Sequence, residues 1–144
     1  MALFYAGGPR KESTRTAGSA FSAGDPLSWD ASSHLSRADD GFAAGIVMGV
    51  AIADSTQSRN DQVPYIVAQP DTVYWSDCTN DASTFTAGEA LDLAYDASIG
   101  YYVLTSANTA TVRVAEDGEY EDLVDSGTSR VLVRFDNTVL SLAQ

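Results

Sequence analysis

The sequence predicts an all-β protein with a small β-barrel-like body and an extended N-terminal arm. Short runs of apolar or β-branched residues recur along the chain, and Gly, Asp, Asn, Ser or Pro bounds each run, as is typical of strands and turns. No segment keeps apolar residues at helical spacing for three turns. One turn-strand pattern occurs twice, which indicates a body built from two similar units.

The expected strands lie in apolar runs spread over residues 46–135. These runs are Ile46–Ala53, Val63–Ala68, Thr72–Trp75, Tyr101–Thr105, Thr111–Ala115 and Val131–Phe135. In the last two runs polar and apolar residues partly alternate, as they do in a strand with one buried face. We therefore expect a sheet in which one face covers a core.

The repeated pattern reads FSAGDPL from Phe21 to Leu27 and FTAGEAL from Phe85 to Leu91. Asp-Ala-Ser follows both copies, at residues 30–32 and 96–98. The Ala-Gly pair predicts a tight turn, and the residues after it predict a strand. Pro26 is tolerated at the first position of a strand but discourages a helix, so the matching stretch Leu91–Tyr95 is also expected to be a strand.

Residues 1–17 differ in charge from residues 18–144, and we expect an extended arm followed by a β-rich domain. The arm carries three basic residues and one acidic residue (3 − 1 = +2), whereas the rest carries five and nineteen (5 − 19 = −14). Fixing 17 backbones costs on the order of 17–34 kcal/mol. Burying the apolar tip returns only roughly 5–8 kcal/mol. This comparison predicts an arm that is loose in the monomer and ordered against another subunit.

The arm also supplies the candidate partner-binding residues. An apolar tip precedes a basic stretch that contains the only lysine of the chain, and this arrangement favours a tether over a frayed terminus. The candidate residues are Leu3, Phe4, Tyr5, Arg10, Lys11 and Arg15. The alternative is a terminus with no role.

Composition excludes several classes of function. Twenty acidic residues against eight basic ones give a net charge of −12, which disfavours binding to nucleic acids and to anionic membranes. The start MALFYAGG lacks a basic region followed by a long apolar stretch, so synthesis in the cytoplasm is expected. The longest apolar run, Phe42–Ala53, is too short to span a bilayer.

No catalytic, metal or cofactor site is expected, and we predict that the protein is not an enzyme. His34 is the only histidine and lies in an expected hairpin turn, and Cys78 has no cationic neighbour. One residue of each type is too few for a zinc site. Acidic residues gather at Asp39-Asp40 and in the cluster 116–122, and we expect these carboxylates to be solvated. The alternative is that they bind calcium.

Aromatic residues on the expected strands favour contacts between subunits. In Tyr74-Trp75 and Tyr101-Tyr102 the neighbouring rings must point to opposite faces of a sheet. At least one ring of each pair therefore lies outside a single core and is available to another surface. The alternative is that these rings form a platform for sugars.

The segment FSAGDPLSWDA, from Phe21 to Ala31, is followed by FAAGIVMGVAIA within Gly41–Asp54. Together with the second copy at 87–91, this pattern resembles the head decoration (cement) proteins of tailed bacteriophages over residues 18 to 135. The resemblance implies a small β-barrel or β-tulip-like body. It implies a homotrimer on the outer surface of the capsid, whose arms clamp neighbouring subunits of the major capsid protein and stabilise the shell.

The expected location is thus the virion, at the outer surface of the head. The stretch Ser55–Gln62 and the acidic loop at 116–125 depart from the family pattern, and they leave the subfamily open. The alternative function is a virion surface-recognition module, such as a head-fibre or carbohydrate-binding domain without catalytic activity.

Overall fold

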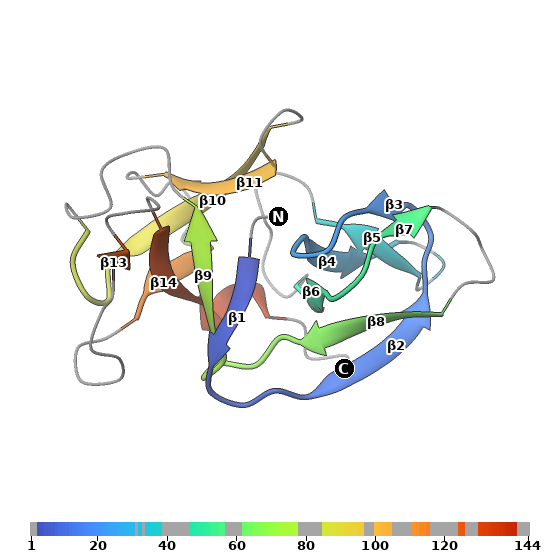
Figure 1. Cartoon of the computed structure of the whole chain (residues 1–144), viewed down its shortest axis with the longest axis horizontal. Coiled ribbons are helices and arrows are strands. Elements are labelled where there is room, and N and C mark those ends of the chain that lie inside the picture. Colours follow the sequence, from blue (N-terminus) through green and yellow to red (C-terminus); the bar gives the residue numbers. More distant parts are fainter. Residues whose placement is uncertain are drawn as a thin grey trace.

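The computed structural model is almost entirely β-structure, which confirms the predicted fold class (Figure 1). It describes residues 3–30, 32, 34–38, 47–56, 62–77, 85–96, 100–104, 111–115, 124–125 and 130–140. Two sheets lie side by side along the long axis of the molecule, and a two-stranded sheet of β3 (Ala20–Phe21) and β7 (Ser55–Thr56) flanks the first. The only helical element among these residues is the short 3-10 helix η2 (Asn137–Val139).

The first sheet has five strands in the spatial order β2-β8-β6-β4-β5. All of its pairings are antiparallel. The strands are β2 (Glu12–Thr16), β4 (Pro26–Trp29), β5 (Leu35–Arg37), β6 (Gly49–Ala51) and β8 (Gln62–Val67). In the view of Figure 1, β2 forms the lower right rim of the molecule.

The second sheet has the order β1-β9-β14-β12-β10-β11, and β13 also pairs with β14. Its pairings are antiparallel as well. The strands are β1 (Leu3–Gly7), β9 (Val73–Asp77), β10 (Ala90–Asp96), β11 (Gly100–Leu104), β12 (Val112–Val114), β13 (Val124–Asp125) and β14 (Arg130–Phe135). Each apolar run expected from the sequence overlaps one of these strands or β6 or β8.

The two sheets repeat one topology. The strands β2, β4, β5, β6 and β8, counted 1 to 5 along the chain, lie side by side in the spatial order 1-5-4-2-3. The strands β9, β10, β11, β12 and β14, counted in the same way, lie in the same spatial order. The register repeats too, because Val50 lies opposite Ile66 as Arg113 lies opposite Arg134. We call these two sets of strands the first unit and the second unit. The duplication noticed in a short sequence motif therefore extends over a whole sheet.

The repeated turns share their hydrogen bonds as well as their sequence. In the first turn the Asp25 N–H donates to the Ser22 carbonyl (3.0 Å), and the Ser22 N–H donates to the Asp25 carboxylate (2.9 Å). Glu89 and Thr86 form the same two bonds in the second turn (3.1 and 3.0 Å). The glycine between them has φ of 90° and 76°, respectively, a conformation that favours glycine.

The apolar core has two main parts. One cluster lies inside the first unit and contains residues such as Leu27 and Leu35, both fully buried. The larger cluster lies inside the second unit and continues into the seam, where Val50 and Ile66 of the first unit join it. A third, smaller cluster around Leu132 lies on the opposite face of the second sheet. The seam therefore holds the two units together by apolar burial.

The predicted division into an arm (1–17) and a body (18–144) does not match the structure. Strand β1 pairs with β9, and β2 pairs with β8 along five residues. Leu3 is only 2% exposed, and the N–H of Gly18 donates to the carbonyl of Leu35 (2.8 Å). The prediction of a loose arm failed because it counted side-chain burial alone and left out the backbone pairing that each existing sheet edge offers.

The sheets are open rather than closed into the expected barrel. Within the described residues, the outer strands of each sheet are joined by no continuous ladder. In the first unit a single parallel bridge links Ala17 to Leu35, and in the second unit β11 approaches β9 to within 8 Å between Cα atoms without pairing. Strand β5, at the edge where the first sheet would close, is only three residues long. It therefore offers few backbone groups for a full ladder. The structure is therefore all-β, as predicted, but without a closed barrel.

Candidate interaction surface

The predicted partner-binding residues lie on β1 and β2 and split between two environments. Leu3 is buried in the main core and Tyr5 packs against it, so these two side chains are structural. Phe4 points to the other face of β1, where the Arg130 guanidinium lies 4.6 Å from its ring centroid. The apolar tip is therefore a strand that alternates between core and surface, rather than a free anchor.

The three basic residues of this segment follow the rim formed by β1, β2 and their connection. The Arg10 guanidinium lies 4.9 Å from the Tyr5 ring centroid and pairs with Glu12 at 3.3 Å. Lys11 is exposed, and its carbonyl accepts a hydrogen bond from Val67. The Arg15 guanidinium lies 5.3 Å from the Trp29 ring centroid. Stacking of this kind holds a guanidinium in place while its edge stays accessible.

An apolar groove of about 260 Å³ separates β1 from the first unit. The lining combines the N-terminal strand with β6, β8 and the Arg10 side chain at its edge. The lining residues are Leu3, Phe4, Tyr5, Arg10, Ala23, Val50, Ala51, Ile52 and Ile66. The structure thus brings Leu3, Phe4, Tyr5 and Arg10 together in one surface feature, whereas Lys11 and Arg15 lie farther along the same rim.

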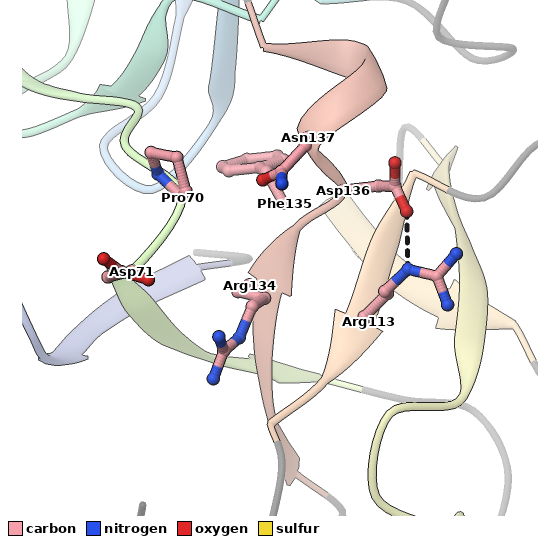
Figure 2. Close-up of a pocket in the computed structure, with 7 residues that line it drawn as sticks. All are labelled: Pro70, Asp71, Arg113, Arg134, Phe135, Asp136 and Asn137. Carbon is pink, nitrogen blue, oxygen red and sulfur yellow. Dashed lines mark hydrogen bonds and ion pairs between the residues drawn. The ribbon is translucent and has the colours of Figure 1, made fainter.

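A second hollow lies on the outer face of the second unit, shown in Figure 2. Its volume is about 250 Å³, and it is lined by Pro70, Asp71, Arg113, Arg134, Phe135, Asp136 and Asn137. Arg113 and Arg134 come from directly opposite positions of β12 and β14. The sequence analysis did not single out this pair, although a basic residue between apolar ones in both strands was a usable signal.

Asp136 fixes one side of this hollow. Its carboxylate accepts hydrogen bonds from the Thr138 N–H (3.0 Å), the Thr138 hydroxyl (2.8 Å) and Arg113 Nε (2.6 Å). Burial alone would raise the pKa of Asp136, but these bonds together lower it below its ordinary value. The Arg113 guanidinium also donates to the Gly88 carbonyl (3.3 Å). Arg113 is therefore held in one orientation.

Another arginine joins the two units. Arg37 of β5 donates a hydrogen bond to the Tyr95 hydroxyl (2.8 Å), and its guanidinium lies 3.9 Å from the Tyr95 ring centroid. This contact was not predictable from the sequence, because 58 positions separate the two residues. Its role in the structure is to connect β5 to β10 across the seam.

The catalytic candidates take structural roles or lie outside the described residues. His34 lies in the turn between β4 and β5, where its backbone N–H donates to the Asp30 carboxylate (3.0 Å) and the Ser32 N–H does the same (2.8 Å). The bond from His34 lowers the pKa of Asp30. Asp39-Asp40, Cys78, the cluster 116–122 and the side chains of Tyr101-Tyr102 lie outside the described residues and side chains.

The predicted opposite orientation of Tyr74 and Trp75 is confirmed. Tyr74 is fully buried in the main core, where its ring meets Phe135 edge-on at 5.7 Å, and Trp75 belongs to the small cluster on the other face. Burial raises the pKa of Tyr74. Trp75 is thus an aromatic side chain of the outer surface of the second unit.

The sequence matches no protein-family model, and no curated protein matches it. In the described part of the chain, no helix has the length and apolar character needed to cross a membrane. Over the same residues, no three or more His, Cys, Asp or Glu side chains gather in a way that would hold a metal ion.

Proposed function

We propose that this protein is a structural decoration (cement) protein that binds the outer surface of a phage head and stabilises the shell. The observation that supports the proposal is the rim formed by β1 and β2. It carries Arg10, Lys11 and Arg15, three of the eight basic residues of a chain with net charge −12. Arginine and aromatic side chains are enriched where proteins bind one another.

The contact with the major capsid protein differs from the one expected of a flexible arm. Because β1 and β2 are already paired with β9 and β8, they present a preformed surface to the shell. A preformed surface loses less conformational entropy on binding than an arm that must become ordered. The cement function therefore rests on a rigid rim rather than on a tether.

The aromatic rings on this rim and beside it favour a protein partner over a sugar. Each of Phe4, Tyr5 and Trp29 has an arginine guanidinium over its ring. A ring covered in this way offers less open face for stacking on a sugar. We therefore place shell binding ahead of the alternative, a carbohydrate-recognition module.

The proposal includes a homotrimer, in which three rims bind one shell together. Linked contacts become effectively intramolecular after the first, so weak individual contacts give tight attachment. The mass of the protein in solution tests this part. We expect three times the chain mass of 15.2 kDa, and a species of 15.2 kDa alone would contradict the trimer.

Binding to shells tests the function itself. The test variant is Lys11→Gln with Arg15→Gln, and the control is Thr86→Glu with Ala87→Glu in an exposed turn of the second unit. Both double variants lower the net charge by the same amount. Shells assembled from the major capsid protein of the same genome should bind wild type and control equally well. They should bind the test variant at least about tenfold more weakly. Absence of wild-type binding would refute the function.

A further inference from the structure

Strand β2 has one edge along which no described strand lies. It is the last strand of the first sheet, and among the described residues β8 is the only strand that pairs with it. In Figure 1 β2 forms the rim of the molecule, and no other strand lies beyond it. An unpaired edge presents a row of N–H and C=O groups, which is a template for pairing with another chain.

The register shows which backbone groups face this edge. Thr14 lies opposite Pro64, which has no N–H and whose carbonyl accepts a hydrogen bond from the Ile52 N–H (3.3 Å), at the end of β6. Two opposed residues of an antiparallel ladder turn their backbone groups either toward each other or away from each other, so those of Thr14 point away from β8. The Lys11 carbonyl accepts a hydrogen bond from β8 (2.7 Å), so the alternation turns the backbone groups of Glu12 outward as well.

The second unit shows how such an edge is filled. In the first unit, Ser13 lies opposite Tyr65. Tyr74 lies opposite Val133, which holds the place of Tyr65 in the second unit. Residues 12–15 of β2 therefore correspond to the stretch of β9 that pairs with β1. The first unit has an equivalent place for an added antiparallel strand, and no described strand occupies it.

The side chains of this edge indicate the chemistry of the strand that it fits. Glu12 pairs with Arg10 at 3.3 Å, so its charge is balanced within the rim. Lys11 and Arg15 share the other face, because side chains alternate along a strand. Among the described residues, neither of these two forms an ion pair with a carboxylate. The Trp29 ring holds the Arg15 guanidinium at this edge, 5.3 Å from its centroid.

An added strand with acidic side chains opposite Lys11 and Arg15 therefore gains two cross-strand pairs of opposite charge. A second copy of β2 would bring the same net positive charge to the edge, which disfavours it as the occupant.

We propose that the open edge of β2 binds an extended acidic segment of a partner protein, which adds to the first sheet as β1 adds to the second. The main chain of the segment exchanges hydrogen bonds with Glu12 and Thr14, and two of its acidic side chains lie opposite Lys11 and Arg15. The identity of the partner rests on the proposed function, in which it is a shell subunit. The site itself does not, because it can be tested without a capsid.

The test follows the amide signals of Glu12 and Thr14 by NMR in the full chain. The probe is the capped peptide Thr-Glu-Val-Thr-Val-Glu-Thr, in which the first valine would lie opposite Thr14. One control peptide has glutamine in place of both glutamates. Two further controls carry an N-methyl group, one on the first valine and one on the central threonine, whose N–H would point away from β2.

We expect saturable shifts of both amides with the unmodified peptide and about three- to tenfold weaker binding of the glutamine peptide. Methylation of the first valine should abolish binding, because it removes a donor of the new ladder, whereas methylation of the central threonine should preserve it. Absence of saturation with the unmodified peptide would overturn the proposal. Equal binding of the two methylated peptides would do the same.

Variants of Thr14 test the same edge from the side of the protein. Thr14→Pro removes the outward N–H without removing a hydrogen bond to β8, and proline is tolerated at such a position of an edge strand. Thr14→Val keeps the N–H and is the matched control. We expect the proline variant to lose peptide binding and the valine variant to retain it. Unchanged binding by a folded Thr14→Pro variant would refute the site, and the methylated peptides decide the outcome if that variant does not fold.

Shell binding separates this site from the proposed function. Thr14→Pro should lose shell binding together with peptide binding. Loss of peptide binding alone would overturn strand addition as the mode of shell attachment and leave the cement function standing. Peptide binding by a wild-type protein that binds no shell would refute the cement function and support the site.

Discussion

The two units of this protein have the same strand order and register but differ on their outer faces. In the first unit Val50 and Ile66 are buried in the seam, where they join the main core. In the second unit the equivalent positions hold Arg113 and Arg134, which line an open hollow. The comparison teaches that the turns and inner faces determine the topology. The outer face is apolar and buried in the seam in one unit, and it is charged and lines a hollow in the other.

The units also differ at their first strands. In the second unit, β9 is covered by β1, which continues that sheet. In the first unit, the equivalent strand β2 is the last strand among the described residues. The N-terminal segment thus completes one unit and forms the rim of the other, which explains how a short segment contributes to both sheets.

The largest expected effect comes from exchanging residues between the outer faces. Ile66→Arg places an unpaired charge in the seam and should lower the free energy of unfolding by about 3–5 kcal/mol. The reverse exchange, Arg134→Ile, removes one of two like charges that lie opposite each other in the ladder. It should change the free energy of unfolding by no more than about 0.5 kcal/mol. Urea denaturation measures both values. Equal costs would show that the outer faces are equivalent, contrary to our comparison.

The inner faces should respond alike. Leu27 and Leu91 occupy the same place after the two repeated turns, and both are fully buried. We expect Leu27→Ala and Leu91→Ala each to cost about 2–5 kcal/mol, because each leaves a cavity in a packed core. The leucines belong to different clusters, so the double variant should show the sum of the two losses. A cost for one leucine only would break the equivalence of the units.

A smaller effect is expected in the repeated turn. Gly88 has φ of 76°, and a Cβ added there would meet no atom within 4 Å. Gly88→Ala should therefore cost only the conformational strain, about 1–2 kcal/mol. Thermal denaturation measures this cost, and the variant Ala87→Gly at the neighbouring position is the control. If Gly88→Ala costs nothing, the turn does not adopt the left-handed conformation that the two copies share.

The smallest effects concern pH and have opposite signs at two buried aspartates. Burial raises the pKa of Asp25 above 3.8, although the Ser22 N–H partly offsets this. Its ionisation therefore costs stability as pH rises from 3.8 toward the folded pKa, and Asp25→Asn should gain stability relative to wild type as pH rises above 3.8. The lowered pKa of Asp136 contributes stability above 3.8 that is lost as pH falls through the folded value.

Asp136→Asn should consequently lose stability relative to wild type at neutral pH, and the difference should shrink in acid. Stability curves of both variants from pH 3 to 7 provide the measurement. Curves with the same slope relative to wild type would contradict the assignment of the two carboxylates to opposite environments.

Much of the fold was predictable because it depends on local signals. The AG turns, the apolar runs and the Pro26 argument identified the strands and the duplication in outline. The pairing of β1 and β2 was not predictable, since ESTRT has no apolar alternation and its partner strand is far away in the sequence. The Arg113–Arg134 pair was missed for a similar reason: only the ladder register brings these two residues together.

Hydrogen exchange of the free protein tests the central claim, a rigid rim made by the N-terminal segment, most directly. Amides of residues 3–7 and 12–16 that pair with β9 and β8 should be protected nearly as strongly as the amides of those two strands, without any shell present. Exchange of both segments at the rate of an unfolded chain, with β8 and β9 still protected, would contradict the account.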